Sequence, residues 1–131
     1  MPNHMHLIIE QVEGNGGETP IASLMKYTAH QFENYLRKHS PEDLELFRVK
    51  WVGREYNFWK PKPDIFELND EETFVQKLEY IHANPLEKHW CLAKDPVEYL
   101  YSSARFYETG EKNFPFLYHY KDWAPSAPKR V

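Results

Sequence analysis

This 131-residue chain lacks the features of secreted, membrane-spanning and disordered proteins. It has a single cysteine, Cys91, so no internal disulfide can form, and a reducing, cytoplasmic setting is expected. Its apolar runs are all shorter than the ~20 residues of a membrane helix, and no basic-then-apolar leader precedes them. Because 41% of the residues are hydrophobic and 16% aromatic, the composition predicts a folded, soluble protein with no membrane partner.

The chain also lacks a strong basic excess. Its formal net charge is −4, which argues against a protein that coats duplex DNA without sequence preference, because such proteins are usually basic. The charge is nevertheless uneven. Basic residues outnumber acidic ones between Lys26 and Lys62, and the stretch from Asp64 to Glu98 is acidic. This distribution allows a local nucleic-acid groove, and it equally suits an ordinary solvated surface.

Hydrophobic periodicity in the first third of the chain predicts a strand and a helix. Residues 4–11 alternate in polarity with a period of two, which indicates a strand with both histidines on one face and Met5, Leu7 and Ile9 on the other. A Thr19-Pro20 start and a Ser40-Pro41 stop bound an amphipathic helix over residues 20–39.

The remaining two thirds predict short strands and a second helix. Residues 44–68 are rich in aromatic and β-branched side chains and are punctuated by Gly53 and Pro61, which indicates short strands or a hairpin. Residues 69–72 have the form of a capping box, and Pro85 must end the helix that follows at about Asn84. A turn at Pro96, a short helix or turn over 99–107 and an aromatic tail come next.

The second helix has an unusual polar face. Its core face is predicted to hold Phe74, Val75, Leu78, Ile81 and His82. Tyr80 falls on the opposite face, and Asn84 projects from that same face one turn later. The two residues are either a surface tyrosine beside a helix-ending asparagine or half of a functional site.

His4 and His6 could supply the other half of that site. Residues i and i+2 of a strand lie ~6–7 Å apart with parallel side chains, so two imidazole nitrogens can converge on one metal ion. Asn84 and water could complete the ligand set. A His-x-His pair alone is weak evidence for a metal site, because such pairs are more often two ordinary polar side chains.

The segments around His4 and Tyr80 each match a known motif. Residues 1–9, MPNHMHLII, resemble the M-P-N-H-x-H-L-L-I signature of the HUH single-tyrosine transposases, the insertion-sequence-200-like family. Residues 80–85, YIHANP, resemble the Y-I-H-x-N-P motif of its REP-associated tyrosine transposase branch. Further matches occur in order at residues 58–59, 74–79 and 101–105, so the resemblance covers nearly all of residues 1–107.

The resemblance implies an enzyme that cleaves and transfers single-stranded DNA, at REP-like hairpin sites. Tyr80 would be the nucleophile that forms a 5′-phosphotyrosine link and releases a 3′-hydroxyl. His4, His6 and Asn84 would hold a divalent ion, and this mixed nitrogen and oxygen ligand set suits Mg²⁺ or Mn²⁺. Since a free tyrosine hydroxyl is a weak nucleophile, the ion would stabilise charge on the leaving 3′-oxygen.

The resemblance also implies a fold and a domain organisation. The family has a ferredoxin-like α+β domain, an antiparallel sheet with helices packed on one face, which we expect over residues 1–107 with residues 108–131 as a tail. Family members normally have another strand and helix before the HUH strand, so either the start is misassigned or the domain is truncated at its N-terminus. A truncated domain would leave the HUH strand unpaired, which favours pairing in a homodimer.

Two other functions stay open. The first is a catalytically inactive or domesticated binder of hairpin or single-stranded DNA, with aromatic residues stacking on bases and cations contacting phosphates. The residues proposed for DNA contact are Lys50, Arg54, Trp59, Lys60 and Lys62; its tryptophan could equally be part of the core. The second is an unrelated His-x-His metal protein. Tyr27 is a rival nucleophile, but no family motif surrounds it.

Overall fold

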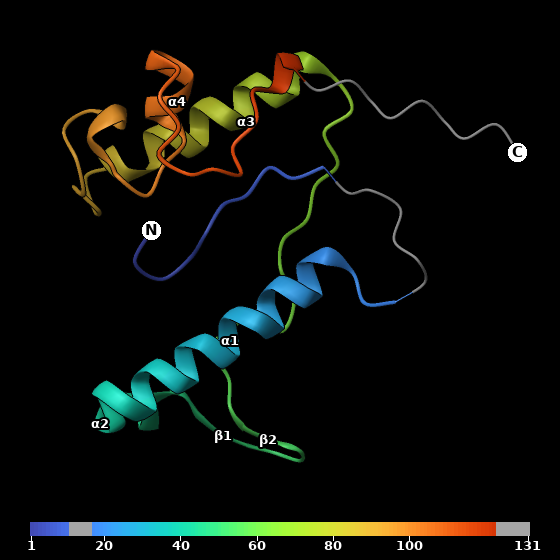
Figure 1. Cartoon of the computed structure of the whole chain (residues 1–131), viewed down its shortest axis with the longest axis vertical. Helices are drawn as coiled ribbons and strands as arrows, with labels where there is room; N and C mark the ends of the chain where they lie inside the picture. The colour runs from blue at the N-terminus through green and yellow to red at the C-terminus, as the bar shows by residue number, and fades with distance from the viewer. Residues whose placement is uncertain (11–16, 123–131) are drawn as a thin grey trace, which may run out of the picture. The chain divides into compact units, whose positions relative to one another are not determined.

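The computed structural model describes residues 1–10 and 17–122. Contacts divide the chain into two compact units: unit 1 comprises Met1–Ile8 with Glu67–Val131, and unit 2 comprises Ile9–Phe66. Helices and one small antiparallel sheet make up the regular structure of the described residues (Figure 1), which confirms the predicted α+β class at this coarse level. None of the helices within this part of the chain is long and apolar enough to cross a bilayer.

Unit 2 begins with the long helix that the sequence predicts. Helix α1 spans Pro20–His39, and its N-cap Thr19 accepts a hydrogen bond from the backbone N–H of Ala22 at 3.2 Å. Proline at the first helical position costs nothing, since that N–H has no partner within a helix. The helix ends at Ser40, whose N–H donates to the Leu36 carbonyl at 2.8 Å. Local sequence signals therefore fix both ends of α1.

A hairpin follows α1, as predicted. The short helix α2 (Pro41–Leu44) leads into strand β1 (Arg48–Trp51), which pairs with the antiparallel strand β2 (Arg54–Tyr56), as Figure 1 shows. Gly53 in the connecting turn has a φ of 75°, a left-handed conformation that glycine adopts without steric cost.

Arg48 holds the hairpin to the residues before it. Its guanidinium donates to both carboxylate oxygens of Glu45 at 2.6 and 2.8 Å, to Glu55 at 2.7 Å and to the Tyr56 hydroxyl at 2.8 Å. The hydrogen bond from Arg48 holds the pKa of the Glu45 carboxyl below its usual value. The bidentate geometry fixes the orientation of the guanidinium plane.

Aromatic side chains pack the segment after the hairpin against α1. The Trp59 indole Nε1 donates to the Thr28 hydroxyl at 3.0 Å. The Phe58 ring lies 5.8 Å from that of Phe32 and 4.7 Å from that of Phe47. Trp59, proposed above as a DNA contact, is half-buried and engaged with α1.

Unit 1 is built around helix α3 (Glu71–Ala83), which a short 3-10 turn over Asn84–Leu86 continues. Two further 3-10 turns, at Pro96–Glu98 and Tyr120–Asp122, and helix α4 (Ala104–Thr109) make up the rest of its regular structure within the described residues. The predicted short helix near residues 99–107 is therefore present, displaced toward its C-terminal end.

The core of unit 1 lies between α3 and α4. Ala104 and Phe106 of α4 are buried, and the His82 Nε2 lies 2.9 Å from the Ser103 hydroxyl. Burial lowers the pKa of His82, so the neutral imidazole is favoured. Tyr120 packs on α3, with its ring 4.8 Å from that of Phe74. The apolar residues predicted for the inner face of α3 are more buried than Tyr80, which confirms that face.

The predicted strand over residues 4–11 is wrong for the residues that the structure describes. Residues 4–10 contain no strand, and Gln11 lies outside the described part. Burial still alternates along this segment, but the apolar side chains are on the exposed side. Met5, Leu7 and Ile9 are 45–48% exposed, whereas His4 and His6 are more buried. A strand needs a ladder partner for its backbone groups, and among the described residues none pairs with this segment.

We predict that Thr28→Val weakens unit 2, since it keeps the side-chain shape and removes the acceptor of the Trp59 N–H. The expected loss is about 1 kcal/mol in the free energy of unfolding, measured by urea denaturation followed through tryptophan fluorescence. Thr28→Ser keeps the hydroxyl and should lose less. Equal stability of the valine variant and the unmodified protein would contradict this role for Thr28.

We also predict a pH-dependent cap at the start of α3. The Asp70 carboxylate accepts hydrogen bonds from the Thr73 N–H at 2.7 Å and from its hydroxyl at 2.8 Å, and these hold the Asp70 pKa below its usual value. A lowered folded-state pKa means that the stabilisation is complete above the unfolded pKa of ~3.9 and is lost as the pH falls through the folded value.

Asp70→Ala should therefore lower the melting temperature by a few degrees at pH 7, and the difference should shrink as the pH falls below 4. Asp70→Asn, which keeps a capping oxygen, is the matched control. A difference that widens in acid would contradict the assignment.

Candidate active site

The two histidines of the N-terminal segment lie together in unit 1. Their ring centroids are 4.9 Å apart, and the rings are nearly perpendicular, at 82°. Both side chains are half-buried, whereas the intervening Met5 is exposed. The pair is therefore presented toward the body of unit 1.

The hydrogen bond of His4 defines its tautomer. Its Nδ1 lies 2.7 Å from Asn3 Oδ1, and an amide oxygen can only accept. A proton on Nδ1 satisfies this contact, and in the neutral ring it leaves Nε2 as the acceptor nitrogen. A neighbour that fixes the tautomer of a ligating histidine in this way is typical of metal sites.

His6 has the same tautomer for a different reason. Its Nε2 lies 3.1 Å from Asn84 Nδ2, and an amide nitrogen can only donate. Burial lowers the pKa of His6, and the neighbouring His4 charge adds to the effect. The neutral imidazole, the form that binds metal ions, is thus favoured.

Asn84 departs from the sequence prediction. We expected it on the same face as Tyr80, yet only 6% of it is exposed. The helix ends there: the Asn84 N–H donates to the Tyr80 carbonyl as the C-cap, and Pro85 follows in a 3-10 turn. The turn directs the amide inward to His6, and the contact spans 78 positions of sequence.

Tyr80 is exposed as predicted and lies beside the histidines. It stands on the last full turn of α3 with 58% of its surface exposed. Its ring centroid is 5.7 Å from that of His6, with an interplanar angle of 77°. Its exposure makes the Tyr80 hydroxyl the accessible candidate nucleophile of this cluster.

The separation of His6 Nε2 and the Asn84 amide matches that of two neighbouring ligands of one small divalent ion. Cis ligands of an octahedral ion with bonds of ~2.1 Å lie ~3 Å apart, and the His6 nitrogen and Asn84 amide are 3.1 Å apart. Rotating the amide exchanges Nδ2 for Oδ1 at that place. In residues 1–10 and 17–122 no cluster of three or more His, Cys, Asp or Glu side chains is placed to hold a metal, so the set would consist of two imidazoles and one amide, with open positions.

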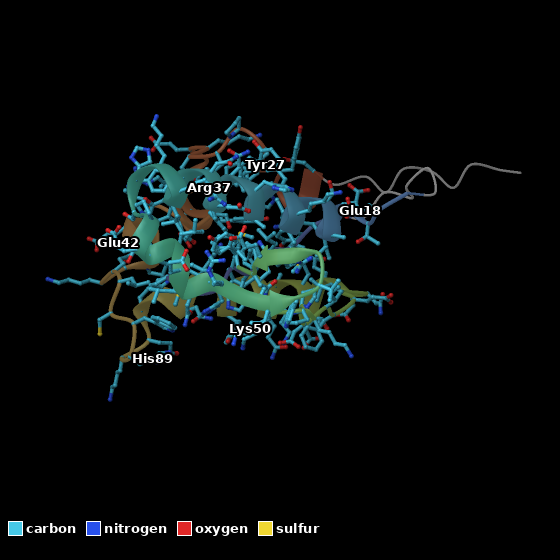
Figure 2. All side chains as sticks on the ribbon, turned by 90° about the horizontal axis from the view of Figure 1, so that it is seen from below. Glu18, Tyr27, Arg37, Glu42, Lys50 and His89 are labelled. Carbon is cyan, nitrogen blue, oxygen red and sulfur yellow. The ribbon has the colours of Figure 1, made fainter. Side chains whose placement is uncertain are left out.

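The other predicted residues belong to unit 2. Lys50 on β1, shown in Figure 2, is exposed, as are Arg54, Lys60 and Lys62. Arg54 donates to Asn57 Oδ1 at 2.9 Å. Tyr27, the rival nucleophile, is exposed on α1 (Figure 2) in the same unit. The structure thus brings together His4, His6, Tyr80 and Asn84, and none of the residues proposed for DNA contact belongs to their unit.

Sequence reasoning missed two residues of this site. Asn3 lies within the first motif, but no role was assigned to it. Trp90 lies six residues after Asn84, and its ring centroid is 5.6 Å from that of His4. No local pattern indicates the position of Trp90, because its contact joins residues far apart in the sequence.

Comparison with known proteins found no relative of this chain. No family model matches the chain, and no curated protein or solved structure matches it either.

Proposed function

We propose that the chain is a metal-dependent DNA strand transferase of the HUH single-tyrosine type, a transposase that cleaves single-stranded DNA through Tyr80. The observation that carries the proposal is the cluster in unit 1. Asn84 contacts His6 at 3.1 Å, and Tyr80, one helical turn earlier, packs on the same imidazole. These are the residues that the two family-like motifs assign to nucleophile and ligands.

The reaction is a transesterification at phosphorus. The Tyr80 oxygen attacks the phosphate, the new Oη–P bond forms and the P–O3′ bond breaks. The phenol loses its proton, and the released 3′-oxygen gains one. The energy of the phosphodiester is kept in the phosphotyrosine, so the same step run in reverse rejoins strands without ATP.

The protein residues contribute position and protonation state. His4 and His6, as neutral acceptors, and the Asn84 oxygen would hold Mg²⁺ or Mn²⁺, which when bound supplies Lewis acidity toward the phosphate and the leaving oxygen. Asn3 orients His4 through its hydrogen bond. Helix α3 fixes Tyr80 and Asn84 to one another, since the C-cap hydrogen bond links them directly.

A single-stranded substrate suits this site. Tyr80 is accessible at the surface of α3, and an extruded or unpaired phosphate can approach it without a duplex groove. A REP-like hairpin with single-stranded flanks is the substrate that the resemblance favours. A ferredoxin-like antiparallel sheet is part of the same proposal. The described helices and strands support only its α+β fold class.

Tyr80→Phe should abolish covalent attachment to DNA, because it removes the attacking oxygen and little else. The assay is denaturing gel electrophoresis after incubation with a labelled single-stranded oligonucleotide carrying a REP-like hairpin, with Mn²⁺ or with EDTA. The unmodified chain should form an adduct only with Mn²⁺, and the matched variant Tyr27→Phe should retain it. An adduct that persists in Tyr80→Phe would refute the role of Tyr80. Hairpin binding without any adduct in the unmodified chain would instead favour the non-catalytic binder.

Loss of Asn84 should weaken metal binding. We expect Asn84→Ala to reduce the affinity for Mn²⁺ by about 10- to 100-fold, measured as free Mn²⁺ by electron paramagnetic resonance during titration. His6→Ala should abolish binding at the same concentrations. Asn69→Ala, a change at an exposed asparagine just before α3, is the control and should bind like the unmodified chain. Unchanged affinity in Asn84→Ala would exclude it as a ligand.

A further inference from the structure

Five rings form a continuous row of contacts through the candidate site. The centroid distances are 5.7 Å from Tyr80 to His6, 4.9 Å from His6 to His4, 5.6 Å from His4 to Trp90 and 5.0 Å from Trp90 to His89. The proposed nucleophile is at one end of this row. A tryptophan and an exposed histidine, which no step of the proposed reaction uses, are at the other end.

The loop after α3 holds Trp90 in place. The N–H groups of Trp90 and Cys91 both donate to the Glu87 carbonyl, at 2.8 and 2.9 Å, and the Leu92 N–H donates to the Pro85 carbonyl at 2.9 Å. Cys91 has a φ of 46°, in the left-handed region that a non-glycine residue rarely adopts. Such strained positions persist where the surrounding structure fixes them and are concentrated at functional sites.

Trp90 keeps one part of its surface accessible although it packs on His4. It is half-buried, and its neighbours Lys88 and His89 are exposed; Figure 2 labels His89. An indole ring with an accessible edge or face, beside a cationic side chain, has the composition of a platform for an unpaired base. The proposed metal ligands lie between this platform and Tyr80.

We infer that Trp90 stacks on the base of the nucleotide on the 5′ side of the scissile phosphate. This inference rests on the proposed function. In an in-line displacement the attacking and leaving oxygens lie on opposite sides of phosphorus, so the nucleotide that carries the leaving 3′-oxygen extends away from Tyr80. Trp90, with His89 beside it, lies toward the opposite end of the ring row. Retention of the released 3′-end there would also keep it ready for the rejoining step.

The alternative is that Trp90 only supports His4. Binding without metal separates the two roles, because base stacking needs no ion, whereas a packing role acts through the metal ligands. The test uses the full chain with Tyr80→Phe, which prevents chemistry, and a fluorescein-labelled 12-mer of oligodeoxyadenosine, with affinity read from fluorescence anisotropy in EDTA.

In EDTA, Trp90→Ala should bind about 5- to 100-fold more weakly, and Trp90→Phe, which keeps a stacking ring, should stay within about threefold of the parent chain. Tyr101→Ala, at an exposed tyrosine of the same unit, should be unchanged. Equal affinity of Trp90→Ala and the parent in EDTA, or no binding by the parent at all, would overturn the inference. Because Trp90→Phe can be compared with Trp90→Ala in melting temperature, misfolding of the alanine variant would be recognised.

A second measurement tests the side on which Trp90 acts. Once the adduct has located the cleaved bond, 2-aminopurine is placed on either side of it, and stacking is read as fluorescence quenching. Quenching at the 5′ neighbour that disappears in Trp90→Ala is expected, and quenching at the 3′ neighbour alone would contradict the assignment. Binding that depends on Trp90 without any adduct would reject the proposed function and retain the stacking role of Trp90. An adduct together with binding that does not depend on Trp90 would support the proposed function and reject the stacking role.

Discussion

The candidate site depends on one hydrogen bond, between the Asn84 amide and His6 Nε2 at 3.1 Å. The N-terminal segment forms no strand in the described residues, so no sheet ladder positions its histidines. Side-chain contacts do so instead: His6 with Asn84 and Tyr80, and His4 with Trp90. A single such bond contributes about 1 kcal/mol net. Its importance lies in specificity, because it brings the two motifs together and places beside His6 Nε2 an amide whose rotation would present Oδ1 to an ion.

Protonation of the site follows from the same contacts. Asn3 as acceptor and Asn84 as donor leave Nε2 as the acceptor nitrogen on both imidazoles. Burial of His6 favours the neutral ring. In the proposed site, two imidazole nitrogens and one amide oxygen would be an incomplete ligand set that leaves positions for water and phosphate oxygens. Such an open set would suit phosphoryl transfer better than a closed structural site.

The sequence predicts well those features that neighbouring residues decide. The ends of α1 follow from Thr19-Pro20 and Ser40-Pro41, and the hairpin turn follows from Gly53, because capping and turn chemistry act within a few residues. The exposure of Tyr80 follows from helical periodicity. The strand expected at residues 4–11 fails since a strand requires a partner that no local pattern supplies. The burial of Asn84, the contact of Trp90 with His4 and the hydrogen bond of Trp59 with Thr28 are also long-range.

The central claim is that the Tyr80 oxygen becomes linked to DNA. The direct measurement is tandem mass spectrometry of the covalent complex, formed with single-stranded DNA and Mn²⁺ and digested with trypsin and nuclease. Cleavage after Lys77 and Lys88 gives the peptide of residues 78–88, in which Tyr80 is the only tyrosine. We expect a phosphonucleotide on this residue. A phosphonucleotide on any other tyrosine, or none in a complex that binds the DNA, would contradict it.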